Sequence, residues 1–255
     1  MPVRLGCEAR RDADDRMMHP ELLPPPRNPA RARPDRRTAV TPAGRARGGR
    51  VVPLPAEWIR AGGLRAFRAD AGYLGRSIAA LKLYLTLVVS QDAAGSDPAP
   101  ILLSYERIAA LSGLSDPLIC AGKKALLDQG LVTTCDDRSG GTIAYQLAGL
   151  RPWDAAACLV LGLPFGAPMT ALHRLTCRKT PNLAALKTYL VLCACGSDPD
   201  GIVSLDVDRA SVLTRTSHVK IIAALAPLQE IGLAEPVGTP SRLGEHRRVR
   251  VLPLR

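Results

Sequence analysis

The sequence has few aromatic residues, few histidines and no long apolar run. Aromatic residues make up 4% of its 255 residues, with two Phe, two Trp and five Tyr. Such a small number argues against a protein that stacks the bases of single-stranded nucleic acid on aromatic rings. No uninterrupted apolar run approaches the roughly 18 residues that a membrane span requires, and the charged, proline-rich N-terminus lacks an apolar signal core. We therefore expect a cytoplasmic protein without a membrane partner.

Motifs that bind metals or nucleotides, or that perform catalysis, are also missing. The four histidines share no metal-ligand spacing, and none of the seven cysteines forms a CxxC pair. Gly122-Lys123 lacks the glycine five residues earlier that a phosphate-binding GxxxxGK loop needs. We expect no catalytic residues, no metal and no cofactor, and hence not an enzyme. The cysteines are scattered and odd in number, and they are expected to be reduced and mostly buried.

Positive charge is abundant but unevenly distributed. The net charge is +11, and residues 1–50 hold 12 Arg against 6 acidic residues. Basic and acidic residues balance between positions 51 and 150, whereas residues 151–255 hold 13 basic and 8 acidic residues. Such an excess attracts polyanions, above all nucleic acid, although it also favours solubility alone.

The first fifty residues have a composition typical of disorder. Prolines and glycines recur, and apolar residues are too few to build a core. We expect a disordered arm over residues 1–50. Two alternatives for its role stay open, namely a flexible basic arm that contacts phosphates and an unstructured leader without function.

One heptapeptide occurs twice and sets the organisation of the rest of the chain. Ala-Ala-Leu-Lys-Leu-Tyr-Leu at residues 79–85 returns as Ala-Ala-Leu-Lys-Thr-Tyr-Leu at residues 184–190. Gly130-Leu131 returns in the same order as Gly232-Leu233. The chain therefore contains two copies of one unit, and we place the domains at residues 1–50, 51–150 and 151–255.

Periodicity, capping residues and turns predict the same order of elements in both copies. Each copy has an opening helix, a short strand, a capped helix, a tight turn, a second helix and two strands. A segment that we call the first lead-in precedes the opening helix of the first copy; it begins near Leu54-Pro55 and contains a helix through Trp58 and Leu64. Leu163-Pro164 matches Leu54-Pro55 and belongs to the second lead-in, before the opening helix of the second copy. The predicted elements are helix 75–90, strand 101–103, a helix capped by Ser104, helix 116–129 and strands 131–135 and 142–147, then helix 182–195, strand 202–205, a helix capped by Asp206, a helix capped by Ser217 that runs to Ile231, and strands 234–237 and 247–252.

This order is that of a winged helix, a helix-turn-helix followed by a β-hairpin wing. The predicted fold class is α+β, mostly helical, with two tandem winged helix-turn-helix domains after the arm. Residues 113–132 resemble the core of bacterial winged-helix proteins, with Gly-Leu-Ser in the turn and Leu four residues before Gly-Leu. In the second copy Ile222, Leu225 and Leu228 are expected to lock the third helix onto the first two.

Tandem winged helices of this size resemble plasmid replication initiators, over residues ~50 to 254 and in architecture only. The resemblance implies that the first winged helix mainly serves dimerisation and that the second is the principal DNA-binding unit. It implies double-stranded DNA, a second copy of the chain and replisome proteins as partners.

The two copies differ in the residues expected to meet DNA. The start of a recognition helix meets base edges, and neighbouring residues meet phosphates. In the first copy Asp116 would repel phosphate and Pro117 offers no hydrogen bond, which leaves Lys123 and Lys124 as secondary contacts. In the second copy nearly all the corresponding residues can donate hydrogen bonds, and the wing is basic. The predicted DNA-binding residues are Arg215, Thr216, Ser217, His218, Lys220, Arg242, His246, Arg247, Arg248 and Arg250.

The expected function is therefore site-specific binding of duplex DNA, in plasmid-type replication initiation or in transcriptional regulation, at a nucleoid or a plasmid. The neutral first copy is expected to serve dimerisation or partner docking. A solvated hairpin is the alternative for the wing arginines, and a plain surface residue for His218. The alternative for the whole chain is a protein-interaction adaptor of the kind that builds chromosome-segregation scaffolds from tandem winged helices.

Overall fold

A computed structural model describes residues 50–91, 99–136, 141–149, 157–196, 198, 200–238 and 246–255. The predicted arm lies outside these ranges except for Arg50, which begins a strand. The predicted domain boundary at residues 150 and 151 also lies outside them, so the division into domains stays a prediction. Among the described helices, none is long and apolar enough to cross a membrane.

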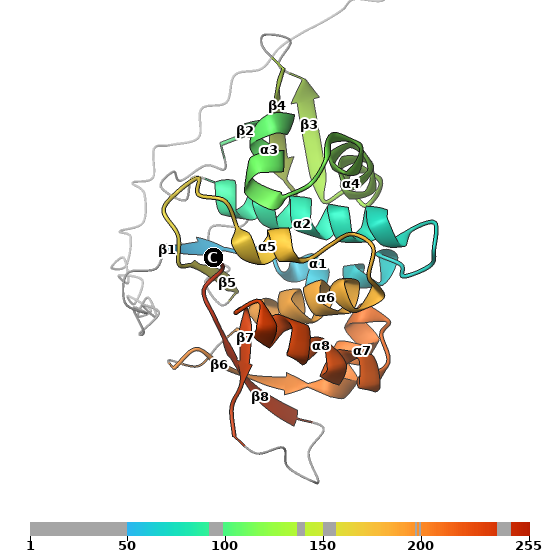
Figure 1. Cartoon of the computed structure of the whole chain (residues 1–255), viewed down its shortest axis with the longest axis vertical. Coiled ribbons are helices and arrows are strands. Elements are labelled where there is room, and N and C mark those ends of the chain that lie inside the picture. Colours follow the sequence, from blue (N-terminus) through green and yellow to red (C-terminus); the bar gives the residue numbers. More distant parts are fainter. Residues whose placement is uncertain are drawn as a thin grey trace, which may run out of the picture. The chain divides into compact units, whose positions relative to one another are not determined.

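The first repeat contains three helices and a three-stranded sheet, in the predicted order (Figure 1). The antiparallel sheet has the strand order β2-β4-β3, so the last strand of the hairpin lies in the middle. The elements are α2 (Leu74–Ser90), β2 (Ile101–Ser104), α3 (Tyr105–Ser112), α4 (Asp116–Asp128), β3 (Val132–Asp136) and β4 (Thr142–Leu147).

The second repeat has the same order and the matching sheet, β6-β8-β7. The chain is thus an α+β protein with two repeated helix–helix–hairpin units, consistent with winged helices. The elements are α6 (Thr180–Cys195), β6 (Ile202–Asp206), α7 (Val207–Thr214), α8 (His218–Glu230), β7 (Ala234–Pro236) and β8 (His246–Val251).

Local sequence signals explain the helix boundaries. The Ser104 hydroxyl accepts a hydrogen bond from the Arg107 amide at 3.1 Å, and the Asp206 carboxylate accepts one from the Arg209 amide at 2.9 Å. Both residues cap the equivalent helix, as predicted. Gly232, directly after α8, has a φ of 72°, which is the left-handed conformation expected at a helix end.

The repeated heptapeptide lies within the buried helices α2 and α6, which pack against each other. Tyr84 and Tyr189 are fully buried, which agrees with a packing role. The Tyr84 hydroxyl donates to the Pro55 carbonyl at 3.0 Å and accepts from the Trp58 indole at 2.8 Å. Burial raises the pKa of this phenol, so the hydroxyl stays protonated.

Two predictions about side-chain burial are wrong. Ile222 is 41% exposed, whereas its neighbour Ile221 is fully buried. The buried residues Ile221, Leu225 and Leu228 follow a four-then-three spacing, which keeps to one helical face better than the two steps of three from Ile222 to Leu228. Among the six described cysteines, Cys193 is buried, two are half-buried and three are exposed. All six are free thiols.

The lead-ins before the two repeats pair with each other. Strand β1 (Arg50–Pro53) is antiparallel to β5 (Cys158–Leu161), and Val52 lies opposite Leu159. The expected first lead-in helix is broken into α1 (Glu57–Arg60) and the 3₁₀ helix η1 (Gly63–Ala66), because Gly62 adopts a φ of 83° between them. The second lead-in contains α5 (Thr170–Arg174).

Each lead-in contacts the helices of the other repeat. The Arg60 guanidinium donates twice, at 3.0 and 2.7 Å, to the Ala194 carbonyl near the end of α6. In the opposite direction, the Met169 amide donates to the Leu111 carbonyl of α3 at 3.0 Å. The two repeats therefore share structure beyond the packing of α2 on α6.

Candidate nucleic-acid interface

The turn before α8 has an unusual backbone at Arg215. Arg215 has a φ of 52° and is the one residue other than glycine with a positive φ in the described part of the chain. The corresponding residue of the first repeat is Gly113, with a φ of 69°. Left-handed backbone costs a residue with a Cβ roughly 1–2 kcal/mol. Arginine therefore occupies a position where glycine would be favoured by the backbone.

The predicted residues at the start of α8 differ in how free their side chains are. Arg215, Ser217 and Lys220 are exposed, and the described residues offer them no carboxylate partner. Ser217 precedes the helix, but its side chain makes no capping hydrogen bond, so the prediction of a side-chain cap at Ser217 is wrong. The half-buried Thr216 lies 3.4 Å from the Thr214 carbonyl through its hydroxyl.

His218 is held by a neighbouring acidic residue. Its Nε2 lies 2.9 Å from a carboxylate oxygen of Asp208 on α7. Both side chains are about half exposed, so the pair is screened by solvent and weak. The imidazole would have to leave Asp208 to contact a base edge.

The solvent-facing side of α8 is more apolar than the comparison of the two repeats in the sequence predicted. Val219 is 77% exposed and Ile222 is 41% exposed. Ala223 and Ala226 are exposed on the following turns. Sequence reasoning placed Ile222 in the core and did not consider Val219, because it compared only the polar side chains of the two helices. Apolar side chains on a recognition helix can contact thymine methyl groups in the major groove, and they can equally contact a protein.

The described part of the wing presents two faces, as strand alternation predicted. On β8 Val249 is fully buried, so Arg248 and Arg250 point away from the core and Arg247 points toward the core side. Arg248 is exposed, and Arg250 forms a 3.2 Å ion pair with Glu235. His246 is exposed at the start of the strand. Arg242 lies outside the described residues.

The two secondary candidates in the first repeat already have partners. The Lys123 amino group lies over the Tyr105 ring, 5.3 Å from its centroid. The Lys124 amino group is 3.4 Å from Asp128, which also pairs with Arg76 at 2.8 Å. The first repeat thus offers fewer free cations on its helix-turn-helix than the second.

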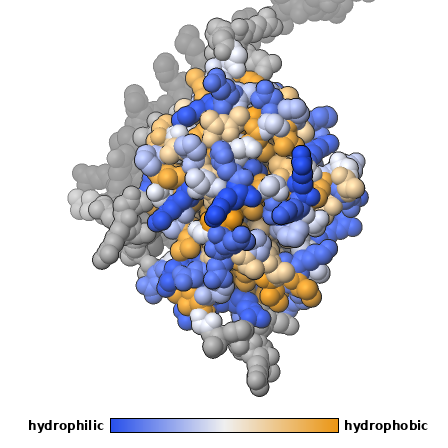
Figure 2. All heavy atoms as spheres, in the orientation of Figure 1, coloured by the Kyte–Doolittle hydropathy of each residue, from blue (hydrophilic) through white to orange (hydrophobic). Residues whose placement is uncertain are grey.

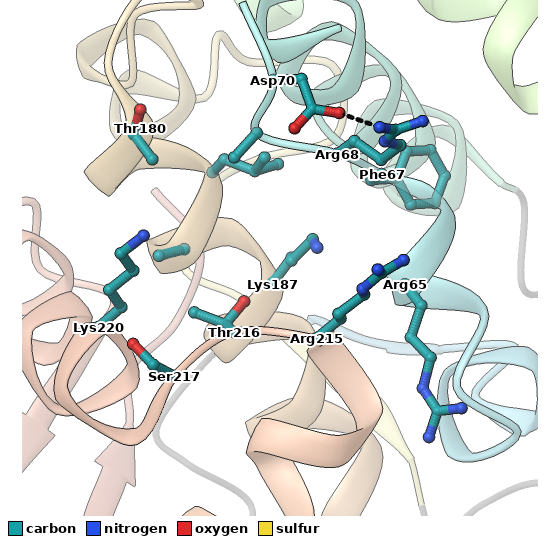
Figure 3. Close-up of a pocket in the computed structure, with 13 residues that line it drawn as sticks. Arg65, Phe67, Arg68, Asp70, Thr180, Lys187, Arg215, Thr216, Ser217 and Lys220 are labelled. Atoms are coloured by element: carbon teal, nitrogen blue, oxygen red, sulfur yellow. Dashed lines mark ion pairs between the residues drawn. The ribbon is translucent and has the colours of Figure 1, made fainter.

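A basic pocket of about 280 Å³ adjoins the start of α8 (Figure 3). It lies between the turn Arg215–Ser217, the first turns of α6 and the segment Arg65–Asp70 after the first lead-in. Lys187 of the repeated heptapeptide reaches it from α6, and Lys220 reaches it from α8. The pocket is thus formed by segments from both repeats, which the sequence comparison did not reveal.

Lys187 is the buried cation of this pocket. Lys187 is only 5% exposed, and its amino group donates to the Thr214 carbonyl at 2.7 Å. Burial, and then the positive charge of Arg215, lower the pKa of Lys187 to about 8. The amino group is therefore still largely protonated at pH 7. A lysine inside an otherwise apolar helix face was the sequence signal for it.

Hydrophilic residues are spread over the face in view, with smaller apolar groups between them (Figure 2). Across the described ranges, no cluster of three or more His, Cys, Asp or Glu residues is arranged to hold a metal ion. Comparisons with family models, with curated proteins and with solved structures give no match for this chain. The case for a function therefore depends on the residues of the site itself.

Proposed function

We propose that the protein binds double-stranded DNA site-specifically through a winged helix-turn-helix formed by its second repeat. The observation that supports this most is the asymmetry between the repeats. Arg215, Ser217 and Lys220 at the start of α8 are exposed and lack carboxylate partners among the described residues, whereas Lys123 and Lys124 of α4 are engaged with Tyr105 and Asp128.

In this proposal the start of α8 enters the major groove and the outer face of β8 contacts the backbone. Ser217 and Lys220 supply donors to bases or phosphates, Val219 contacts thymine methyl groups, and Arg248 contacts a phosphate. The first repeat, a second winged helix in this proposal, serves dimerisation or the docking of partners such as replisome proteins. The process is plasmid-type replication initiation or transcriptional regulation.

The test compares two double variants that remove the same charge. Lys220→Gln with Arg248→Gln changes the proposed interface, and Arg76→Gln with Arg178→Gln changes exposed or ion-paired residues outside it. Binding to duplex DNA is followed by fluorescence anisotropy over a salt series. Because each neutralised phosphate contact lowers the salt slope by roughly one, the interface variant should lose about two units of slope and the control none. An equal loss in both variants would place the main contacts elsewhere.

Selection of bound plasmid or genomic fragments by the whole chain addresses the process. Repeated sites within a replication origin would support initiation, and single sites in promoters would support regulation. Fragments bound without any shared sequence would contradict site-specific binding.

A second candidate function is a protein-interaction adaptor, and the exposed Val219 and Ile222 on α8 favour it. Solvent-exposed apolar side chains on one helix are a common element of protein interfaces. An adaptor of this kind should not bind random duplex DNA even at low salt. Tight, salt-sensitive binding in that experiment would exclude the adaptor as the sole function.

A further inference from the structure

The basic pocket has an excess of positive charge that the described residues do not balance. Five basic side chains line it, and Asp70 is the single acid. Asp70 is paired with Arg68, and Arg65 points away from the pocket to donate to the Val212 carbonyl at 2.6 Å (Figure 3). The cations that face the pocket without a carboxylate partner among the described residues are Lys187, Arg215 and Lys220.

Burial makes this imbalance costly for Lys187. Taking a charge out of water is unfavourable unless another group compensates it. The Thr214 carbonyl supplies one hydrogen bond, and a second positive charge, Arg215, lies close enough to lower the pKa of the lysine further. An anion in the pocket would stabilise both cations at once.

Two helix N-termini border the same pocket. Thr180 begins α6 and Ser217 precedes α8. In both helices the first turn contains no acidic residue, and the residue before the helix makes no side-chain capping bond. The helix dipole and free amide groups favour negative charge at such ends. The first turn of α6 offers fewer free amides than that of α8, because Pro181 has no amide hydrogen and the Asn182 amide donates to the Lys179 carbonyl at 3.0 Å. The hydroxyl groups of Thr180 and Ser217 add further donors, whereas the Thr216 hydroxyl donates to the Thr214 carbonyl.

We propose that this pocket binds a phosphate group, held by Lys187, Arg215 and Lys220. Several cations, two hydroxyls and two helix ends suit a tetrahedral anion with several acceptor oxygens better than a single carboxylate. The volume, near the lower end of ligand pockets, suits a phosphate with a small attached group. The phosphate belongs either to the DNA backbone or to a free phosphorylated small molecule.

The first repeat does not offer the same pocket. The equivalent lysine, Lys82, donates to the Leu175 carbonyl at 3.1 Å, and Gly113 brings no charge where the second repeat has Arg215. The space beside Gly113 is taken by His173, whose ring would lie 2.9 Å from a Cβ at that position. The three unpaired cations of the pocket thus belong to the second repeat, which is also the repeat proposed to bind DNA, and the segment 65–70 completes the pocket wall.

The test titrates the whole chain with inorganic phosphate at pH 7, against chloride of equal ionic strength, by calorimetry and by thermal unfolding. Arg215→Asn removes one cation and keeps a residue that tolerates left-handed backbone. Lys187→Met removes the buried cation. Arg209→Gln, an exposed arginine of α7 outside the pocket, is the matched control. We expect at least a tenfold loss of phosphate affinity in each pocket variant and no change in the control.

Circular dichroism verifies that each variant is folded. If Lys187→Met does not fold, Arg215→Asn still tests the proposal. Phosphate binding no stronger than that of chloride would overturn the inference, as would equal binding by wild type and Arg215→Asn. Unlike the duplex test, this titration contains no DNA. If the wild-type chain binds duplex DNA but not phosphate, this inference alone is removed. If the wild-type chain binds phosphate but not duplex DNA, the proposed function alone is removed.

A competition experiment separates the two sources of phosphate. If saturating phosphate displaces a duplex more than chloride does, and Arg215→Asn removes the excess, the pocket holds a phosphate of the DNA backbone. If the duplex and inorganic phosphate bind without competing, the pocket holds a free phosphorylated molecule. Either result supports a phosphate site, and it assigns the source.

Discussion

Arg215 occupies in the second repeat the position that Gly113 occupies in the first, and both have a left-handed backbone, with φ values of 52° and 69°. The fold tolerates glycine at this turn, yet the second repeat has an arginine there. Its guanidinium lies on the side of the basic pocket where Lys187 ends (Figure 3). Residues held in unfavourable conformations are concentrated at functional sites.

The first prediction is that Arg215→Gly stabilises the fold while weakening anion binding. Glycine adopts positive φ without a steric penalty, so the free energy of unfolding should rise by roughly 1 kcal/mol. Urea denaturation measures this change. A loss of stability would mean that the Arg215 side chain holds the fold together.

The reverse substitution at the equivalent position has the opposite expected sign. Gly113→Ala should destabilise the protein by about 1–3 kcal/mol, because alanine is strained at this φ. Its Cβ would also lie 2.9 Å from the His173 ring. Stabilisation by this change, measured in the same way, would contradict the equivalence of the two turns.

The second prediction concerns pH. The pKa of Lys187 is about 8 in the folded protein, whereas the ordinary value of a lysine, expected in the unfolded chain, is 10.5. Between these values the unfolded chain binds more protons, so this residue makes stability rise with pH. Relative to Lys187→Met, the wild type should gain on the order of 2 kcal/mol between pH 7 and pH 10.

Denaturation of both proteins at each pH gives this difference, in which other titrating groups largely cancel. Lys220→Met, which changes an exposed lysine of the same pocket, serves as the control and should leave the slope of the wild type unchanged. A flat difference between wild type and Lys187→Met would mean that the lysine is not desolvated.

The third prediction is that the two repeats unfold together. The pair Val52 and Leu159 is fully buried where the lead-ins join, and each lead-in also bonds to the other repeat. Leu159→Ala should therefore lower the free energy of unfolding of the whole unit, by about 2–4 kcal/mol. Tryptophan fluorescence and circular dichroism should report coincident transitions. Separate transitions would show that the repeats are independent.

The fourth prediction tests how closely α4 approaches α2. A Cβ at Gly122 would lie 2.9 Å from the Ala79 carbonyl carbon. Gly122→Ala should destabilise the protein by about 1–3 kcal/mol, although alanine favours helices. The equivalent residue, Ala224, is 1% exposed against α6, and its change to glycine should cost about 1 kcal/mol. A stabilising Gly122→Ala, observed by urea denaturation, would contradict this packing.

Sequence reasoning located the elements well because their signals are local. The capping side chains of Ser104 and Asp206 and the left-handed Gly232 depend on a few neighbouring residues. Helix 75–90 was predicted within one residue of α2, since its apolar periodicity is long and regular. The first lead-in helix was wrong because Gly62, which breaks it, was not weighed against the apolar residues around it.

The sequence by itself determined the repeat, the order of the elements and the unequal charge of the two copies. The tertiary structure decided which of those charges are free, since Asp208 holds His218 and Glu235 holds Arg250 from other elements. It also formed the basic pocket, whose lining brings Arg68 together with Arg215 from distant parts of the sequence. Such contacts have no local signal, because they arise when separately folded segments pack their faces together.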